Sequence, residues 1–224
     1  MMNRRVFFKE VRGHLKLLKL SQAQVDGFNI LLDEGVKRDL PTSWIAYVLA
    51  TAWHETAYTM QPVTEYGSKA YLTGKTYWPF IGRGYVQLTW DYNYIKMGKF
   101  LDLDLKGNPE LANDPSIAAQ VIYEGMERGM FTGKRLKRYL KSPTCQHSSY
   151  KQARRIVNGM DKASTIATYA LKFQEALLSA MNAPKEVVIK APKVTPKAPK
   201  KSAWWIRLIV AIFKAIFQLN KSRS

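Results

Sequence analysis

Residues 46–57 read Ala-Tyr-Val-Leu-Ala-Thr-Ala-Trp-His-Glu-Thr-Ala, and the rest of the chain is arranged around them. Apolar side chains recur at helical spacing from Trp44 onward, which predicts a helix. Glu55 stands near its end, among aromatic and aliphatic neighbours that would partly shield the carboxyl group from water. Desolvation disfavours the charged form of a carboxyl group, which suits a general acid that must hold a proton near neutral pH.

A second carboxyl group follows ten residues later, at Glu65. Thr64 and Gly67 place it in a predicted polar loop, where we expect it to stay ionised. Two carboxyl groups in contrasting environments are typical of glycoside hydrolysis. The plainer alternative is that Glu55 is a solvated or ion-paired residue at a helix end, because glutamate pairs at this spacing are common.

A second motif lies in residues 82–94, which read Gly-Arg-Gly-Tyr-Val-Gln-Leu-Thr-Trp-Asp-Tyr-Asn-Tyr. It resembles the Gly-Arg-Gly, Gln-Leu-Thr/Ser and Asn-Tyr signature of family 19 glycoside hydrolases, and His54-Glu55-Thr56 resembles their first catalytic segment. The resemblance covers roughly residues 40–182 and is closer to the short, cysteine-poor endolysins of bacteriophages than to plant chitinases. It implies a mainly α, lysozyme-like α+β fold with a small hairpin beside the catalytic cleft.

The resemblance also implies roles for individual residues. Glu55 matches the general acid that protonates the glycosidic oxygen, Glu65 the general base that activates water, and Thr89 the hydroxyl residue that helps to hold this water. Three further residues match sugar-contacting positions: Gln87, Asn93 and Asn158. An inverting mechanism of this kind places its two carboxyl groups about 6.5–9.5 Å apart.

The plant enzymes differ from this sequence in two ways. They carry a longer insertion between the two glutamates, and an arginine shortly after the Asn-Gly segment, for which Lys162 is the nearest counterpart. We expect neither a metal nor a cofactor. The histidines lack the His-Glu-x-x-His spacing of a zinc site; they are His14, His54 and His147.

The remaining elements are predicted to be mostly helical. Helices are expected over residues 6–20, from a Ser21–Gln24 capping box to about Val36, from Asp114-Pro115 to about Met130, over 150–157 and over 162–182. Residues 58–80 are expected to form an irregular loop, and residues 134–150 an exposed basic loop or short helix. Residues 80–90 alternate, with Tyr85, Gln87 and Thr89 opposite Val86, Leu88 and Trp90, which predicts a short strand or hairpin. Such a strand would direct Gln87 and Thr89 toward a cleft and bury their neighbours.

The chain is predicted to have three parts. Residues 1–183 form the catalytic domain, and residues 184–202, with three Ala-Pro-Lys repeats, form a stiff charged linker. Residues 203–224 form an amphipathic helix with basic residues on one stripe, better suited to lying in a bilayer interface than to crossing it. A helix docked on the domain or on a partner would have the same pattern.

The formal net charge is +18, and it favours binding to polyanions such as anionic lipids, bacterial envelopes or nucleic acid. Chitin is uncharged, whereas peptidoglycan in its envelope is acidic. The single cysteine, Cys145, excludes an internal disulfide and fits a reducing compartment. Without an evident signal peptide, we expect synthesis in a bacterial host cytoplasm and action at the cell wall or periplasm.

These features together predict a phage or prophage endolysin that hydrolyses β-1,4 bonds of peptidoglycan. The expected partners are glycan strands and, through residues 203–224, an anionic membrane surface; the protein is expected to be a monomer without specific nucleic-acid binding. A chitinase is the enzymatic alternative. A membrane-active basic protein that kills through its C-terminal helix is the alternative from another class, and nucleic-acid binding has only the charge in its favour.

Overall fold

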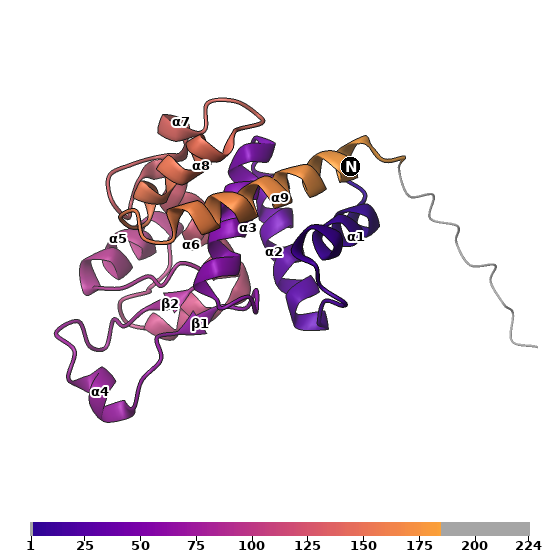
Figure 1. Ribbon diagram of the computed structural model, residues 1–224. Helices are drawn as coiled ribbons and strands as arrows, with labels where there is room; N and C mark the ends of the chain where they lie inside the picture. The colour runs from indigo at the N-terminus through magenta and orange to yellow at the C-terminus, as the bar shows by residue number, and fades with distance from the viewer. Residues whose placement is uncertain (1, 185–224) are drawn as a thin grey trace, which may run out of the picture. The chain divides into compact units, whose positions relative to one another are not determined.

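Most of residues 2–184, the part of the chain that the computed structural model describes, are helical (Figure 1). The elements are α1 Arg4–Leu15, α2 Gln22–Lys37, α3 Thr42–Glu55, β1 Val63–Thr64, α4 Lys69–Thr73, β2 Arg83–Gly84, α5 Asp91–Leu101, the 3-10 helix η1 Pro109–Asn113, α6 Pro115–Arg128, α7 Leu136–Tyr139, α8 His147–Ala153, the 3-10 helix η2 Arg154–Ile156 and α9 Ala163–Asn182. The predicted helix over 203–224, and the predicted linker beyond Pro184, lie outside the described residues.

Helix α3 is the centre of the domain. All but three of its residues are buried, and it packs against α9 and α2. A helix that is apolar all round belongs inside a protein, which explains why this stretch organises the fold. Its first turn is tied to the α7–α8 connection, where the Ser43 N–H donates to the carbonyl of Pro143 at 2.9 Å. Its last turn lies on the side of the two strands (Figure 1).

Two helix starts follow the predicted capping chemistry. The Ser21 hydroxyl accepts the N–H of Gln24, whose side chain accepts the N–H of Ser21 in return. Asp114 accepts the N–H groups of Ser116 and Ile117 at the start of α6. Such caps satisfy backbone donors that a helix start leaves unpaired.

The prediction for the first helix was wrong at its C-terminal end, because α1 stops at Leu15 instead of continuing to residue 20. Lys16 takes a left-handed backbone conformation (φ 56°), and its N–H bonds the carbonyls of the last turn. Leu18, within the range predicted to be helical, is fully exposed. The sequence contains no glycine here, which is the usual signal for such an ending.

The strand predicted within residues 80–90 is present but short, since β2 is Arg83–Gly84, and its partner β1 was not predicted. β1 and β2 pair antiparallel over two residues each, Val63 with Gly84 and Thr64 with Arg83. Arg83 and Leu88 then exchange both backbone hydrogen bonds, which closes a tight turn. The predicted alternation over 80–90 is therefore wrong at its ends: Tyr85 is buried, and Trp90 is 39% exposed.

Three other segments differ from the prediction. Part of the expected loop over 58–80 forms α4 and β1. The segment over 134–150, expected to be an exposed basic loop or short helix, does contain the short helix α7 and the start of α8, but Leu136 and Leu140 are buried. The expected helix over 150–157 begins earlier, at His147, and tightens into η2. The last helix is confirmed as α9, in which Ile166, Phe173 and Leu177 are buried.

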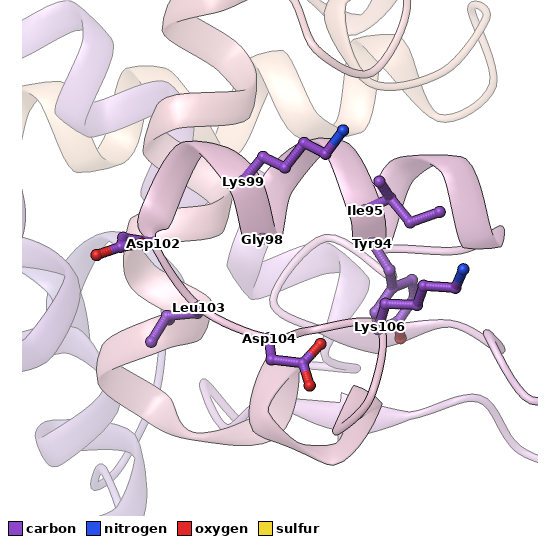
Figure 2. A pocket seen from close by; sticks show the side chains of 8 residues that line it. All are labelled: Tyr94, Ile95, Gly98, Lys99, Asp102, Leu103, Asp104 and Lys106. Atoms are coloured by element: carbon purple, nitrogen blue, oxygen red, sulfur yellow. The ribbon is translucent and has the colours of Figure 1, made fainter.

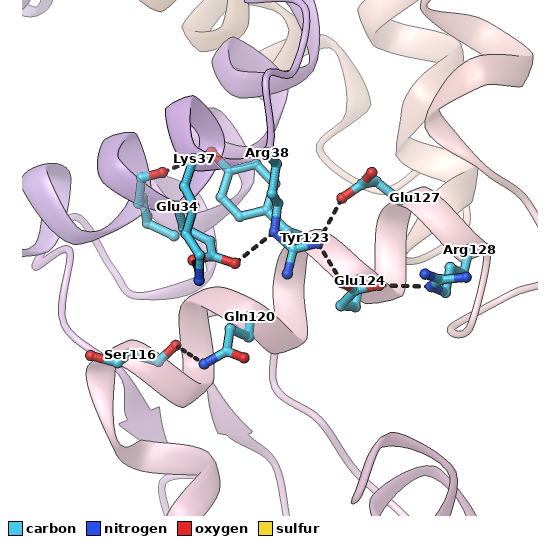
Figure 3. Close-up of polar contacts among 10 residues, drawn as sticks. Glu34, Lys37, Arg38, Ser116, Gln120, Tyr123, Glu124, Glu127 and Arg128 are labelled. Atoms are coloured by element: carbon cyan, nitrogen blue, oxygen red, sulfur yellow. Dashed lines mark hydrogen bonds and ion pairs between the residues drawn. The ribbon is translucent and has the colours of Figure 1, made fainter. Parts of the chain in front are cut away.

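A network of ion pairs joins α2 to α6 (Figure 3). Arg38, which caps α2, donates to Glu34, Glu124 and Glu127, and Glu124 also accepts from Arg128 at 2.7 Å. Glu124 is buried, so each of its oxygens needs a donor. Among the helices described here, none is long and apolar enough to cross a bilayer.

Candidate active site

Glu55 is the last residue of α3, and an arginine from a distant part of the chain holds its carboxylate. Arg154 Nη1 lies 2.7 Å from Glu55 Oε1. The Arg154 side chain is 3% exposed and that of Glu55 20% exposed. Arg154 Nε also donates to the carbonyl of Asp161 at 3.1 Å. The sequence left open that Glu55 is simply an ion-paired residue at a helix end, and its contact with Arg154 is such an ion pair.

Arg154 was not among the predicted site residues. Lys162, the expected counterpart of the family's arginine, is instead the exposed N-cap of α9. A signal for Arg154 was present in the sequence: it follows the aromatic Tyr150 by four residues, a spacing that places both on the same side of a helix, and the structure buries both. An arginine on a buried face needs an acidic partner, since its charge is costly to bury alone.

His54 adds a neutral imidazole next to the ion pair. Its Nδ1 is buried without a hydrogen-bond partner among the described residues. Burial lowers the pKa of His54 below its ordinary value of 6.5; the charge of Arg154 lowers it too, while that of Glu55 acts in the opposite direction. His54 is therefore uncharged at neutral pH.

The backbone turns sharply directly after Glu55. Ala57, Tyr58 and Met60 all have positive φ, between 48° and 70°. The Thr56 hydroxyl accepts the N–H of Met60 at 3.1 Å. The turn also needs Gly27, since a Cβ atom there would lie 1.7 Å from the Met60 carbonyl oxygen. Contacts with α2 therefore fix where the chain goes after Glu55.

Glu65 follows β1, and both of its carboxylate oxygens accept hydrogen bonds. Oε1 accepts from the Tyr77 hydroxyl at 2.9 Å, and Oε2 accepts from the Gly82 N–H at 3.1 Å. The Glu65 N–H donates to the Gly82 carbonyl at 2.7 Å, which extends the strand pair by one step. The predicted loop carboxylate is thus held in one orientation by the segment that leads into β2.

Three of the predicted residues lie in one hydrogen-bonded group with this strand pair. Gln87 donates to the carbonyl of Val63 at 2.9 Å, and its amide lies directly over Gly82. The Thr89 hydroxyl donates to the carbonyl of Gln87 at 2.8 Å, and Asn93 donates to the carbonyl of Thr89 at 2.8 Å. The positive φ of Gln87 (55°) makes this compact arrangement possible.

Asn158, the sixth predicted residue, belongs to the Glu55 side. Its N–H donates to the carbonyl of Arg154 at 3.0 Å, and its exposed side chain accepts the N–H of Gly159. The six predicted residues therefore fall into two groups, one around Glu55 and one around Glu65. Within residues 2–184, no direct hydrogen bond or ion pair joins the two carboxylates.

Aromatic rings extend from Glu65 to the surface. The ring of Tyr77, which bonds Glu65, lies 5.1 Å from that of Trp90, and Trp90 stacks on Tyr92 at 6.1 Å. Trp90 and Tyr92 are 39% and 59% exposed. Exposed aromatic faces beside fixed polar groups are a usual feature of small-molecule binding sites. This surface was not predicted, because the alternation over residues 80–90 places Trp90 on the buried face of a strand.

One pocket, of about 380 Å³, lies away from these groups (Figure 2). It is lined by Tyr94, Ile95, Gly98, Lys99, Asp102, Leu103, Asp104 and Lys106, none of which is a predicted site residue. Among the residues that the structure describes, no three His, Cys, Asp or Glu side chains are grouped closely enough to hold a metal ion.

No protein-family profile matches the sequence. Short local similarities to plant enzymes exist. The chain is 50% identical to Endochitinase 1 of Theobroma cacao over 40 residues, which is 17% of this chain and 12% of that protein. It is 49% identical to Endochitinase CH25 of Brassica napus over 47 residues, 20% of this chain and 14% of that protein. The chain thus matches only a small part of each relative's length.

The structure is similar to chitinase C from Streptomyces griseus HUT6037. The TM-score is 0.53 at 16% sequence identity, with 79% of this chain and 78% of that chain covered. At this identity the similarity concerns the fold alone. The described domain therefore shares its mainly α fold with this chitinase, and it has the small hairpin that the sequence predicted.

Proposed function

We propose that this protein is a glycoside hydrolase that cleaves β-1,4 bonds of peptidoglycan, as a phage or prophage endolysin. One observation carries the proposal: on this fold, two carboxylates are each held by their own donors, Glu55 by Arg154 and Glu65 by Tyr77 and Gly82. Enzymes that hydrolyse glycosides by two carboxyl groups need this separation of surroundings, since one group gives a proton and the other takes one.

In the proposed reaction Glu55 is the general acid. Arg154 holds Oε1, and within residues 2–184 Oε2 has no partner, which leaves it free for the glycosidic oxygen. As the proton leaves, negative charge develops on Glu55, and the buried guanidinium of Arg154 compensates it. Arg154 thereby stabilises the product form of the acid.

Glu65 is the proposed general base, which takes a proton from water on the opposite face of the sugar. The Thr89 hydroxyl donates its own hydrogen to Gln87, so its lone pairs remain to accept a hydrogen bond from that water. Gln87, Asn93 and Asn158 are the proposed sugar contacts. Trp90 and Tyr92 add apolar faces for the sugar rings.

Peptidoglycan is the preferred substrate because of the charge of the chain. A formal net charge of +18 suits an acidic bacterial envelope and has no evident use on uncharged chitin. A chitinase is the second candidate, because the named relatives are endochitinases. Either function needs no cofactor in this proposal.

We also propose how the protein meets its substrate. It is made in a bacterial host cytoplasm, acts as a monomer at the wall or periplasm, and contacts an anionic membrane surface through residues 203–224, beyond a linker over 184–202. If residues 203–224, the tail, kill cells without the catalytic domain, a full chain whose catalytic domain is inactive should still lyse living cells.

The test compares Glu55→Gln and Glu65→Gln with the control Asp39→Asn. Asp39 is an exposed acid with a φ of 52°, which asparagine also tolerates. We expect both glutamine variants to lose at least about a hundredfold in turnover of purified sacculi, as loss of a general acid or base does, and the control to keep full activity. Mass spectrometry of the released fragments identifies the bond from the reducing-end sugar.

Full turnover of sacculi by Glu55→Gln would refute the mechanism. Preferential turnover of chitin oligomers by the wild type would favour the chitinase. Sacculi contain no membrane, so lysis of cells by Glu55→Gln without turnover of sacculi would assign the killing to the tail.

A further inference from the structure

The segment over residues 128–160 is basic without interruption by acids. It holds nine lysines and arginines and neither aspartate nor glutamate. The nine are Arg128, Lys134, Arg135, Lys137, Arg138, Lys141, Lys151, Arg154 and Arg155. Of these nine residues, only Arg154 belongs to the proposed catalytic site.

Part of this charge surrounds a hollow of about 610 Å³ between α5 and the α6–α7 connection. Its lining residues are Lys96, Lys99, Phe100, Arg128, Met130 and Arg135. The volume is in the range of small-molecule sites, about 300–1,000 Å³. Four cations and no acid line the hollow, so it attracts anions.

Three of the four cations are available to a ligand. Arg128 is already engaged, because its Nε lies 2.7 Å from Glu124 (Figure 3) and its guanidinium covers the Phe100 ring at 4.1 Å. Figure 2 shows Lys99 extending from α5 away from Asp104. Among residues 2–184, no acidic side chain pairs with Lys96, Lys99 or Arg135.

The apolar residues of the hollow distinguish between anions. Phe100 is 40% exposed, but because Arg128 covers a face of its ring, that face cannot stack on a base or a sugar. Phe100 and Met130 thus present apolar edges beside unpaired cations. A phospholipid has this combination, a phosphate joined to methylene groups, whereas a nucleic-acid base could not stack on the face of Phe100 that Arg128 covers.

We propose that this hollow binds an anionic membrane surface. The headgroup phosphate lies among Lys96, Lys99 and Arg135, and the first acyl methylenes contact Phe100 and Met130. This membrane contact belongs to the globular domain and is separate from the one proposed for residues 203–224. It would hold the domain at the bilayer whatever the tail does.

Vesicle binding by the full chain tests the proposal. The variant Lys99→Gln/Arg135→Gln is compared with Arg5→Gln/Lys9→Gln, which removes one lysine and one arginine from exposed positions on α1, at the other end of the domain in Figure 1. On phosphatidylglycerol vesicles each contacting cation contributes about fivefold, so the first variant should bind about 25-fold more weakly. The control should lose less than about threefold, because salt screens distant charges.

A fluorescent label separates this contact from the tail. In a Cys145→Ser background, an environment-sensitive dye at Lys96→Cys should shift to the blue on phosphatidylglycerol vesicles and stay unchanged on phosphatidylcholine, while a dye at Lys9→Cys should not respond. Equal weakening by both double variants, or no shift at position 96, would overturn the proposal. So would Lys99→Gln/Arg135→Gln weakening DNA binding while leaving vesicle binding intact, which would assign the hollow to nucleic acid.

Discussion

Arg154 is buried beside Glu55, and substituting it should destabilise the domain more than most other substitutions of buried residues near Glu55. In Arg154→Met the Glu55 carboxylate loses its partner, and breaking a buried ion pair costs about 3–5 kcal/mol. Glu55 is 20% exposed, so water partly replaces the lost guanidinium, and we expect the lower figure, about 3 kcal/mol. For a domain of this size that corresponds to a fall of about 6–12 °C in Tm.

Glu55→Gln is the other half of the experiment. It leaves the guanidinium of Arg154, whose side chain is 3% exposed, with a neutral acceptor, at a cost of about 2 kcal/mol. The double variant contains neither buried charge, so its destabilisation should be less than the sum of the two by about 2 kcal/mol. Urea unfolding followed by tryptophan fluorescence measures all three free energies.

Arg155→Met is the matched control. Arg155 is the next residue and donates only to Gln152, at 3.1 Å, among the described residues. We expect its free energy of unfolding to stay within about 0.5 kcal/mol of the wild type. If the destabilisations of Arg154→Met and Glu55→Gln add up to that of the double variant within about 0.5 kcal/mol, the idea that Arg154 and Glu55 act as a pair is refuted.

Two further predictions concern the surroundings of Glu55. Gly27→Ala should lower the free energy of unfolding by about 3 kcal/mol, because the new Cβ would lie 1.7 Å from the Met60 carbonyl oxygen. Gly13→Ala is the control: a Cβ there has nothing within 4 Å, so this variant should gain about 0.5–1 kcal/mol. Equal urea midpoints for the two variants would contradict this. Burial lowers the pKa of His54 in the folded state. As the pH falls through 6.5, the unfolded state therefore binds a proton at His54 before the folded state does, and the free energy of unfolding should decrease. The stability advantage of wild type over His54→Gln should therefore shrink between pH 7.5 and 5.5, and an unchanged advantage would show that His54 is not responsible.

The parts of the fold with strong local signals were predictable. The capping box at Ser21 and the Asp114-Pro115 start depend on neighbouring residues only, and the structure has both. The end of α1 depends on a left-handed conformation at Lys16, and the turn after β2 on one at Gln87, which few sequence patterns indicate for residues other than glycine. Errors therefore concentrate where a non-glycine residue turns the chain.

The candidate site was predictable only in part, for a related reason. Motif resemblance named Gln87, Thr89 and Asn93 together, and the structure joins them by hydrogen bonds. Arg154 reaches Glu55 across 99 positions of sequence, and no local pattern specifies that contact. Tertiary packing of α8 and η2 against the domain decides it.

The burial of α3 and the brevity of β1 and β2 set different local stabilities for the two carboxylates. Backbone amides in a helix enclosed on all sides exchange with solvent only when the whole domain opens, while two-residue strands open through small fluctuations. On warming, the region of Glu65 should loosen first, while Glu55 remains in place. Heat inactivation should then begin below the melting temperature and reverse on cooling, because the interior that guides recovery is still assembled.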